Sequence, residues 1–371
     1  MTPARLPPRP RLRLRGVLLQ AGAGLAILLF LSWLAHNATD ALARRNMDLD
    51  WSFLLRPAGF DIPFRLTGWD TGDSYLAALG VAGLNTLLAA ALAIMGATAG
   101  GVAVALLRLS RNPLARATSR GYTELVRNTP QLLQIIFWYI VVLQALPPPR
   151  ASLSPLPGVF LNVRGLLLPA PVSAWFPLVL FLGLVLLVVP GFVLPPERRW
   201  WLRAPGVLLL ASGLAASQYS WPALRGFNFD GGWRLPPELL ALSAGIAIYT
   251  SAFLAENVRA SIAGVAWGQT EAARSLGLSG ARTMRLVILP QALRTLLPPL
   301  TNHYVNIVKS TTLGAAIAYP EILQIFARTV LNQSGRAVEV MTIVLGVYLV
   351  INLSVAGAMN RWDRRLRQQG R

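Results

Sequence analysis

The chain has 371 residues, of which 54% are hydrophobic and 13% are charged. Soluble globular proteins carry roughly 25% charged residues, so this composition argues strongly against a soluble enzyme and against a disordered protein. The sequence has no cysteine and two histidines, which excludes disulfides and thiolate sites and argues against a histidine-rich metal centre. The mean hydropathy of +0.51 leaves an integral membrane protein as the class that fits.

Eight apolar segments are candidates to cross about 30 Å of hydrocarbon as helices. In chain order they are 16–35, 76–107, 122–145, 173–194, 203–217, 237–260, 291–317 and 338–359, the fifth being the shortest. The first is preceded by Arg5, Arg9, Arg11, Arg13 and Arg15. No small-residue cleavage site follows it cleanly, so we expect a retained signal anchor rather than a cleaved signal peptide.

The formal net charge of +19 comes from basic clusters between the apolar runs, a pattern typical of membrane topology rather than of nucleic-acid binding. With the N-terminus in the cytoplasm, the cytoplasmic segments hold 22 arginines and the outer segments hold 10. This bias is the one that the positive-inside rule requires, and it predicts that both chain ends are cytoplasmic.

No catalytic motif is present in the sequence. It contains neither a phosphate-binding Gly-x-x-x-x-Gly-Lys-Ser/Thr loop nor a Gly-x-Ser-x-Gly or His-Glu-x-x-His pattern. We therefore predict no catalytic residue, no metal site and no cofactor in this chain, and we do not expect it to be an enzyme.

Residues 264–294 are too polar to cross a membrane and too regular for an unstructured loop. A helix is predicted to start near Thr270, because this residue can cap the helix and Glu271 suits its positive end. Ala272 and Ala273 have small side chains, so another protein could approach this face of the helix closely.

Gly277 is predicted to end this helix, because glycine readily adopts a positive φ. A second amphipathic stretch, from Ala281 to Leu289, is expected to end at Pro290. Together these features predict a short helix-turn-helix on the cytoplasmic face, with a loop resting on lipid headgroups as the alternative.

These residues resemble the cytoplasmic coupling loop of bacterial ABC importer permeases. The resemblance rests on Glu271-Ala272-Ala273, then Gly277, then Val287-x-Leu289-Pro290, although the family usually has isoleucine where Val287 stands. In that family the loop docks into a cleft on the ATPase subunit. The resemblance therefore implies that coupling to an ATPase involves the residues Glu271, Ala272, Ala273, Gly277, Leu289 and Pro290.

Two other stretches resemble the polar-amino-acid branch of these permeases, the histidine/glutamine permease type. They run from Tyr122 to Gln134 (YTELVRNTPQLLQ) and from Ala252 to Arg259 (AFLAENVR). The resemblance covers about residues 76–360. The segment 147–236, with two extra spans, resembles the larger permease subunits of general L-amino-acid transporters.

The resemblance implies an all-α polytopic membrane protein with about eight transmembrane helices, both ends cytoplasmic, and a core like that of a type I ABC importer permease. An N-terminal anchor helix with a periplasmic segment is expected at 1–75. The two core parts would be 76–146 and 237–360, the latter including the coupling loop 264–290. An insertion at 147–236 and a basic cytoplasmic tail at 361–371 complete the chain.

It also implies a transmembrane permease subunit of an ATP-driven importer of polar or general L-amino acids in the bacterial inner membrane. The implied partners are a second permease subunit, expected to be a paralogue, an ABC ATPase dimer that binds ATP and Mg²⁺, a periplasmic amino-acid-binding protein, and the lipid bilayer. Alternating access, driven by ATP binding in the ATPase subunits, is the mechanism that the family uses.

Polar residues in the predicted spans suggest a path for the substrate. Asn302, Asn306 and Lys309 are four and three residues apart, which places them on one helix face. Such a face in an apolar span predicts a water-lined cavity, or else contact with polar groups of a partner permease. We expect the residues Asn85, Gln131 and Gln134 to line the same cavity, and His303 to be an interfacial residue rather than a proton relay.

Two acid–base pairs lie near cytoplasmic span ends. Glu124 and Arg127 are three residues apart, as are Glu256 and Arg259, so each pair shares a helix face. We interpret both as structural pairs at the cytoplasmic mouth, with two matching halves of a gate as the alternative.

An ion-coupled secondary amino acid transporter is the alternative function. It predicts inverted repeats and broken helices with carboxylates near the membrane midplane. The sequence shows neither, because its carboxylates lie near the span ends. A membrane scaffold without transport would leave the coupling loop and the polar helix face unexplained.

Overall fold

The computed structural model of the protein describes residues 14–44, 49–193 and 196–368. The chain divides after Ser52 into two compact units. The first contains the helix α1 (Leu14–Arg44), which is apolar from Leu18 to Leu34. The predicted anchor segment is therefore helical. The residues Arg5, Arg9, Arg11 and Arg13, which we expected to orient it, lie outside the described residues.

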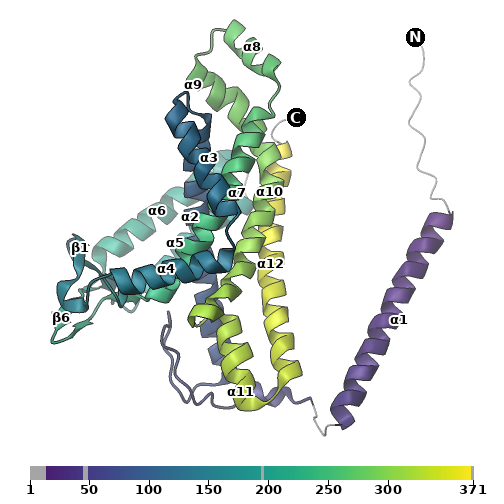
Figure 1. Ribbon diagram of the computed structural model, residues 1–371, viewed down its shortest axis with the longest axis vertical. Coiled ribbons are helices and arrows are strands. Elements are labelled where there is room, and N and C mark those ends of the chain that lie inside the picture. Colours follow the sequence, from purple (N-terminus) through teal and green to yellow (C-terminus); the bar gives the residue numbers. More distant parts are fainter. Residues whose placement is uncertain (1–13, 45–48, 194–195, 369–371) are drawn as a thin grey trace. The chain divides into compact units, whose positions relative to one another are not determined.

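Four long helices form the body of the second unit and lie side by side in Figure 1: α2 (Tyr75–Leu109), α7 (Pro237–Ala263), α10 (Leu289–Ser310) and α12 (Ala337–Gln368). α2 packs along α7, and α10 packs against both α7 and α12. In the described part of the chain, three helices are long and apolar enough to cross a membrane, namely Tyr75–Leu109, Pro237–Ala263 and Ala337–Arg367.

The predicted single span 122–145 is wrong. Its residues fall into two helices, α3 (Pro113–Arg127) and α4 (Gln131–Ala145), which are separated by Asn128–Pro130. Pro130 explains the break, because proline has no N–H donor and its ring disfavours helical backbone in the preceding residue. The span 291–317 is also interrupted, since α10 gives way to the 3-10 helix η4 (Thr311–Ile317).

Shorter helices occupy both ends of the helical body. At one end (top of Figure 1) lie α8 (Trp267–Ser275) and α9 (Gly280–Thr283), followed by the π-helix η3 (Met284–Ile288). Toward the opposite end lie the π-helix η5 (Leu323–Val330) and α11 (Leu331–Ser334). The 3-10 helices η1 (Trp51–Leu55) and η2 (Pro149–Ala151) are short connecting elements.

The segment 147–236 contains the two expected extra helices, α5 (Phe176–Val193) and α6 (Pro196–Ala216), which pack against each other. It also contains strands, so the all-α prediction is wrong here. The strands are β1 (Leu153–Leu156), β2 (Val159–Asn162), β3 (Gly165–Leu168), β4 (Ala170–Pro171), β5 (Tyr219–Ser220), β6 (Ala223–Arg225), β7 (Asn228–Asp230) and β8 (Trp233–Leu235).

These strands form three small antiparallel sheets with the orders β1-β2-β3-β8, β4-β5 and β6-β7. In the first sheet, the aliphatic segments are only four residues long and tight turns separate them, a pattern that favours hairpins over helices. Gly165, the first residue of β3 after the β2–β3 turn, has a φ of +110°, which an L side chain rarely adopts.

The core of the second unit is the contact between α2 and α7. On α2 the buried side chains are mostly alanines, and those at intervals of four or seven residues form one face: Ala78, Ala82, Ala89, Ala93 and Ala97. At Gly101 a Cβ would lie 2.6 Å from the Cβ of Leu254, and at Gly96 one would lie 2.9 Å from the Cβ of Ala247. Small residues therefore let the two helix backbones approach closely.

A buried polar network ties α2 and α12 to the segment between α10 and α11. The amide of Asn85 donates to the carbonyls of Phe64 and Pro320, both at 2.9 Å. The Tyr348 hydroxyl donates to Glu321 Oε2 at 2.6 Å, and the same carboxylate accepts from the backbone N–H groups of residues 323 and 324. Since buried polar groups are costly unless they are paired, this network fixes the segment.

Gly101→Ala tests the close approach of α2 and α7. The added methyl group has to displace Leu254, and overpacking of this kind costs about 1–3 kcal/mol. Gly83→Ala on the same helix is the matched control, because a Cβ there meets nothing within 4 Å. We expect Gly101→Ala to lower the unfolding temperature in detergent micelles and Gly83→Ala to leave it unchanged or raise it. Equal shifts in both variants would contradict the packing described.

Candidate functional site

The coupling segment, residues 264–290, folds into a helix-turn-helix at one end of the body. α8 begins at Trp267 and not near Thr270, so the predicted capping role of Thr270 is wrong. A side-chain hydrogen bond stabilises the earlier start, because the indole N–H of Trp267 donates to Glu271 Oε1, one turn further along, at 2.8 Å. Gly277 follows the helix with a φ of +77°, which confirms its predicted conformation.

The second half of the coupling segment continues without interruption into the helical body. α9 begins after Ser279, which accepts a hydrogen bond from the backbone of Arg282, and then passes through η3 into α10. The predicted stop at Pro290 is wrong. Pro290 lies in the first turn of α10, a position that proline tolerates, and α10 continues through two further prolines, Pro298 and Pro299.

Large apolar side chains are exposed at both ends of α8. Trp267 at its start is 67% exposed, and Leu276 at its end is 82% exposed. Glu271 and Ala272 are exposed between them, whereas Ala273 is buried against the rest of the protein. Exposed large apolar side chains with acidic and small neighbours are typical of a protein-docking surface.

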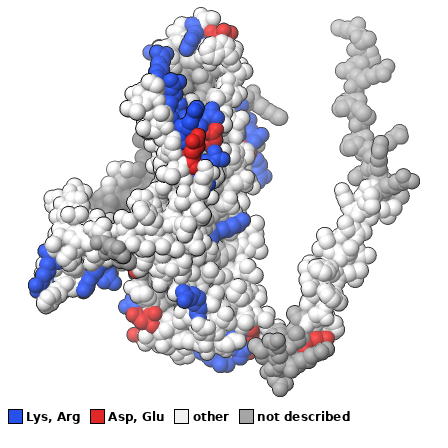
Figure 2. All heavy atoms as spheres, in the orientation of Figure 1, with Lys and Arg blue, Asp and Glu red and all other residues white. Residues whose placement is uncertain are grey.

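Below the coupling segment, Glu256 on α7 joins two arginines. It accepts from Arg259 Nε at 3.1 Å and lies 3.5 Å from Arg108 Nη2 at the end of α2. The predicted Glu256–Arg259 pair is therefore present. Figure 2 shows basic side chains crowded around acidic ones in this upper part of the molecule. This cluster joins the ends of α2 and α7.

The other predicted pair does not form. Among the described residues, no ion pair joins Glu124 to Arg127. The guanidinium group of Arg127 lies instead over the ring of Phe253 on α7, 4.9 Å from its centroid. A cation over an aromatic face is a favourable contact that does not need a carboxylate.

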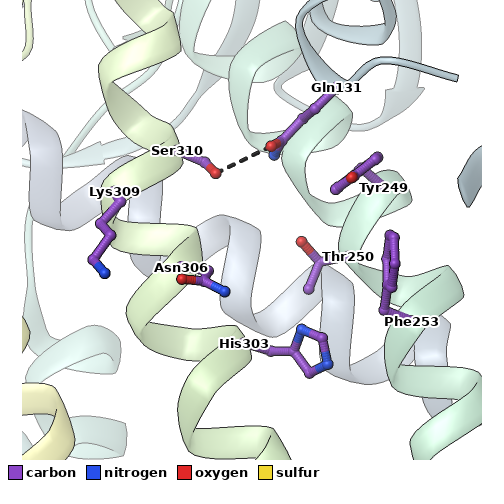
Figure 3. Close-up of a pocket in the computed structure, with 8 residues that line it drawn as sticks. All are labelled: Gln131, Tyr249, Thr250, Phe253, His303, Asn306, Lys309 and Ser310. Carbon is purple, nitrogen blue, oxygen red and sulfur yellow. Dashed lines mark hydrogen bonds between the residues drawn. The ribbon is translucent and has the colours of Figure 1, made fainter.

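A polar pocket of about 330 Å³ lies among α4, α7 and α10. Figure 3 shows the residues that line it: Gln131, Tyr249, Thr250, Phe253, His303, Asn306, Lys309 and Ser310. The Ser310 hydroxyl donates to Gln131 Oε1 at 3.1 Å, which joins α4 to α10. The pocket thus collects polar groups from three helices within an apolar body.

One side of the pocket is closed by His303. Its Nε2 lies 2.7 Å from the Asn257 amide nitrogen, and its ring is 6.1 Å from that of Phe253. Lys309 lies at the edge, and Figure 3 shows its side chain extending away from Thr250 and Phe253. The charge of Lys309 therefore borders the pocket rather than filling it.

The structure brings together only part of the predicted path. Gln131, Asn306 and Lys309 line the pocket, but Asn85, Gln134 and Asn302 do not. The amides of Asn85 and Gln134 are used within the fold, since Gln134 Nε2 donates to the carbonyls of residues 126 and 129 at the break between α3 and α4. Asn302 is exposed elsewhere on α10.

The α7 contribution to the pocket was missed from the sequence. In an apolar helix, Phe253 follows Tyr249 by four residues and Thr250 by three, so it shares a face with both. That spacing is the signal that could have revealed them. No group of three or more acidic or histidine side chains in the described part of the chain could hold a metal ion.

Comparisons with known proteins cover most of the chain. Residues 93–368 match the family described as "Binding-protein-dependent transport system inner membrane component". The chain is 43% identical over 373 residues to YhdX of Escherichia coli (strain K12), named for an amino-acid ABC transporter permease, with 95% of this chain and 94% of that protein covered.

Two further relatives are similar over nearly their full length. The general L-amino acid transport system permease protein AapQ of Rhizobium johnstonii is 36% identical, with 91% of this chain and 88% of that protein covered. The glutamate/glutamine/aspartate/asparagine transport system permease protein BztB of Rhodobacter capsulatus is 32% identical, with 97% of this chain and 95% of that protein covered.

Proposed function

Because the chain belongs to the family of binding-protein-dependent transport system inner membrane components, we propose that it is a transmembrane permease subunit of an ATP-driven ABC importer for amino acids. The observation that carries this proposal is the similarity, over more than nine tenths of the chain, to three permeases named for amino-acid transport. The chain contributes the path and the coupling, while ATP and Mg²⁺ bind to a separate ATPase chain.

The proposed assembly has four kinds of partner in the bacterial inner membrane. A periplasmic amino-acid-binding protein delivers the substrate, and this chain forms the path together with a second permease, expected to be a paralogue. An ABC ATPase dimer closes on ATP and moves the coupling segments, which switches the path between inward- and outward-facing states. Purifying the assembled complex and identifying its subunits and its bound amino acid tests this composition.

We propose that α8 is the part of this chain that docks on the ATPase. Its exposed Trp267 and Leu276 supply apolar contact area, and the exposed Glu271 and Ala272 lie between them. Leu289 and Pro290 begin α10 and so link the docking helix to the helices that line the path.

Gly277→Ala is predicted to uncouple the transporter. A left-handed φ costs a non-glycine residue about 1–2 kcal/mol, so the docking arrangement becomes less populated by a factor of about 5 to 30. We expect amino-acid uptake into proteoliposomes to fall by a similar factor while membrane insertion stays normal. Gly280→Ala is the matched control, since neither glycine has a neighbour near its Cβ and only Gly277 has a positive φ. Full uptake by Gly277→Ala would contradict the coupling role.

We further propose that the pocket lined by Gln131, Thr250 and Asn306 is part of the substrate path. Its polar groups can replace the water around an amino acid, and Lys309 at its edge can attract the carboxylate that every amino acid carries. The cluster of Glu256, Arg259 and Arg108 lies on the cytoplasmic side of this pocket, where it can hold the path closed.

Lys309→Met is predicted to reduce amino-acid uptake about tenfold, because it keeps the side-chain length and removes a charge-assisted contact. Asn302→Leu is the control, since Asn302 is exposed on the same helix but outside the pocket. Uptake and substrate-stimulated ATP hydrolysis are measured in the assembled complex. If Lys309→Met instead separates the two permeases and leaves the remaining complex fully active, Lys309 belongs to an interface and not to the path.

The proposed topology has both ends in the cytoplasm and about eight spans. A reporter enzyme that is active only outside the cytoplasm is expected to be active when fused after Thr71, Arg150 or Gly231. Fusions after Arg116 or Ser279 are expected to be inactive. A cytoplasmic result at Gly231 alone would mean that the pair of helices α5 and α6 does not cross the membrane as two spans.

A further inference from the structure

The segment 147–236 carries a second pocket, far in the sequence from the proposed coupling segment. The sheet β1-β2-β3-β8 is covered on one side by the hairpin β6–β7, and the rings of Phe160 on β2 and Phe229 on β7 are 4.8 Å apart. Arg150 adds a second contact to the hairpin, because its guanidinium group lies 3.9 Å from the ring centroid of Phe227. The hairpin is therefore held in place on the sheet.

Between the sheet and the hairpin lies a cavity of about 190 Å³, lined by Asn162, Arg164, Leu167, Asn228, Phe229, Gly231 and Arg234. The strand register explains why Arg234 lines it. Leu167 pairs with Phe160 on one side and with Arg234 on the other, so all three side chains lie on the face that the hairpin covers.

The β2–β3 turn holds Arg164 at the same cavity. The Asn162 carboxamide accepts from the backbone N–H of Arg164 at 2.8 Å, and its amide group donates to the Ser152 hydroxyl at 2.9 Å. Gly165 has no room for a side chain, since a Cβ would lie 2.0 Å from the carbonyl oxygen of Leu235. The turn is thus fixed by buried contacts, although the arginine side chain itself is exposed.

In the part of the chain that the structure describes, no ion pair joins Arg164 or Arg234 to a carboxylate. The two stretches that carry the strands, 146–175 and 217–236, contain four arginines and one acidic residue, Asp230. Asp230 is already engaged, because its carboxylate lies 3.2 Å from Arg225 and accepts from the N–H of Gly231. Figure 2 shows basic side chains gathered at this end of the molecule, on the left of the view.

We propose that this cavity binds a carboxylate group, held by the guanidinium groups of Arg164 and Arg234 and by the amide of Asn228. Two guanidinium groups at one small cavity suit a planar anion, because each can donate two parallel hydrogen bonds to it. The carboxylate belongs either to a free small acid or to an acidic side chain of the binding protein that docks on this side of the membrane. The second source, and the outward orientation of the cavity, rest on the proposed function.

The experiment uses the assembled complex in lipid nanodiscs at low ionic strength, with [¹⁴C]succinate as the probe in equilibrium dialysis. The pocket variant combines Arg164→Gln with Arg234→Gln. The control variant combines Arg65→Gln with Arg225→Gln, which removes the same charge from two exposed ion pairs outside the cavity. In a second arm, surface plasmon resonance measures the affinity of the binding protein for the same three complexes.

We expect the pocket variant to weaken one of the two affinities at least tenfold while the control changes it less than threefold. Loss of succinate binding identifies a free acid as the ligand. Loss of binding-protein affinity alone identifies an acidic side chain of the partner. The affected affinity should also fall with added salt, as expected for charge pairs near the surface. If the pocket variant changes neither affinity more than the control does, the arginines are a solvated rim and the proposal is wrong.

A folding defect is separated from a binding defect by a third variant, Arg164→Lys with Arg234→Lys. It keeps both charges but loses the paired hydrogen bonds, so it should bind more weakly than the natural protein and more tightly than the glutamine variant. Thermal unfolding of all variants should agree closely, because the replaced side chains are exposed. Amino-acid uptake by the unaltered complex tests the proposed function independently, since succinate binding does not require it.

Discussion

The close approach of α2 and α7 is the constraint on which the rest of the second unit depends. At Gly96, Gly100 and Gly101 the space that a side chain would occupy is taken by α7, and α2 faces α7 with alanines. Two helices in such contact can slide or tilt little without losing packing along their whole length. The position of α7 relative to α2 is therefore fixed, and the elements that pack against α7 are positioned by it.

Many residues of the candidate site lie on α7. Tyr249, Thr250 and Phe253 form one wall of the polar pocket, and Glu256 and Arg259 form the ion cluster one turn further along α7. α3 is tied to the same helix, since its residue Tyr122 lies 2.6 Å from the Ser251 hydroxyl. α7 then ends and leads directly into the coupling segment. One wall of the pocket, the ion cluster and the proposed docking helix α8 thus follow one another along a single stretch of chain.

The sequence predicted long elements well and local breaks poorly, for physical reasons. The length of the apolar segments identified the positions of α2, α7 and α12. The tendency of glycine to adopt a left-handed backbone conformation identified the turn at Gly277. Hydropathy cannot register Pro130, which divides an apolar run that otherwise looks continuous. It also cannot show which polar side chains are used by the fold, as Asn85 and Gln134 are. The pocket needed residues from three helices, and their meeting is set by tertiary packing.

Pro298 and Pro299, inside α10, have a mechanical consequence. Each lacks the N–H that would bond to the preceding turn, so two consecutive hydrogen bonds of the helix are missing there. These residues lie between Leu289, where the coupling segment joins α10, and Asn306 in the pocket. α10 is therefore expected to bend more easily at Pro298 and Pro299 than in the helical segments on either side. With α8 docked on an ATPase as proposed, a displacement of the Leu289 end of α10 is taken up by bending at these prolines.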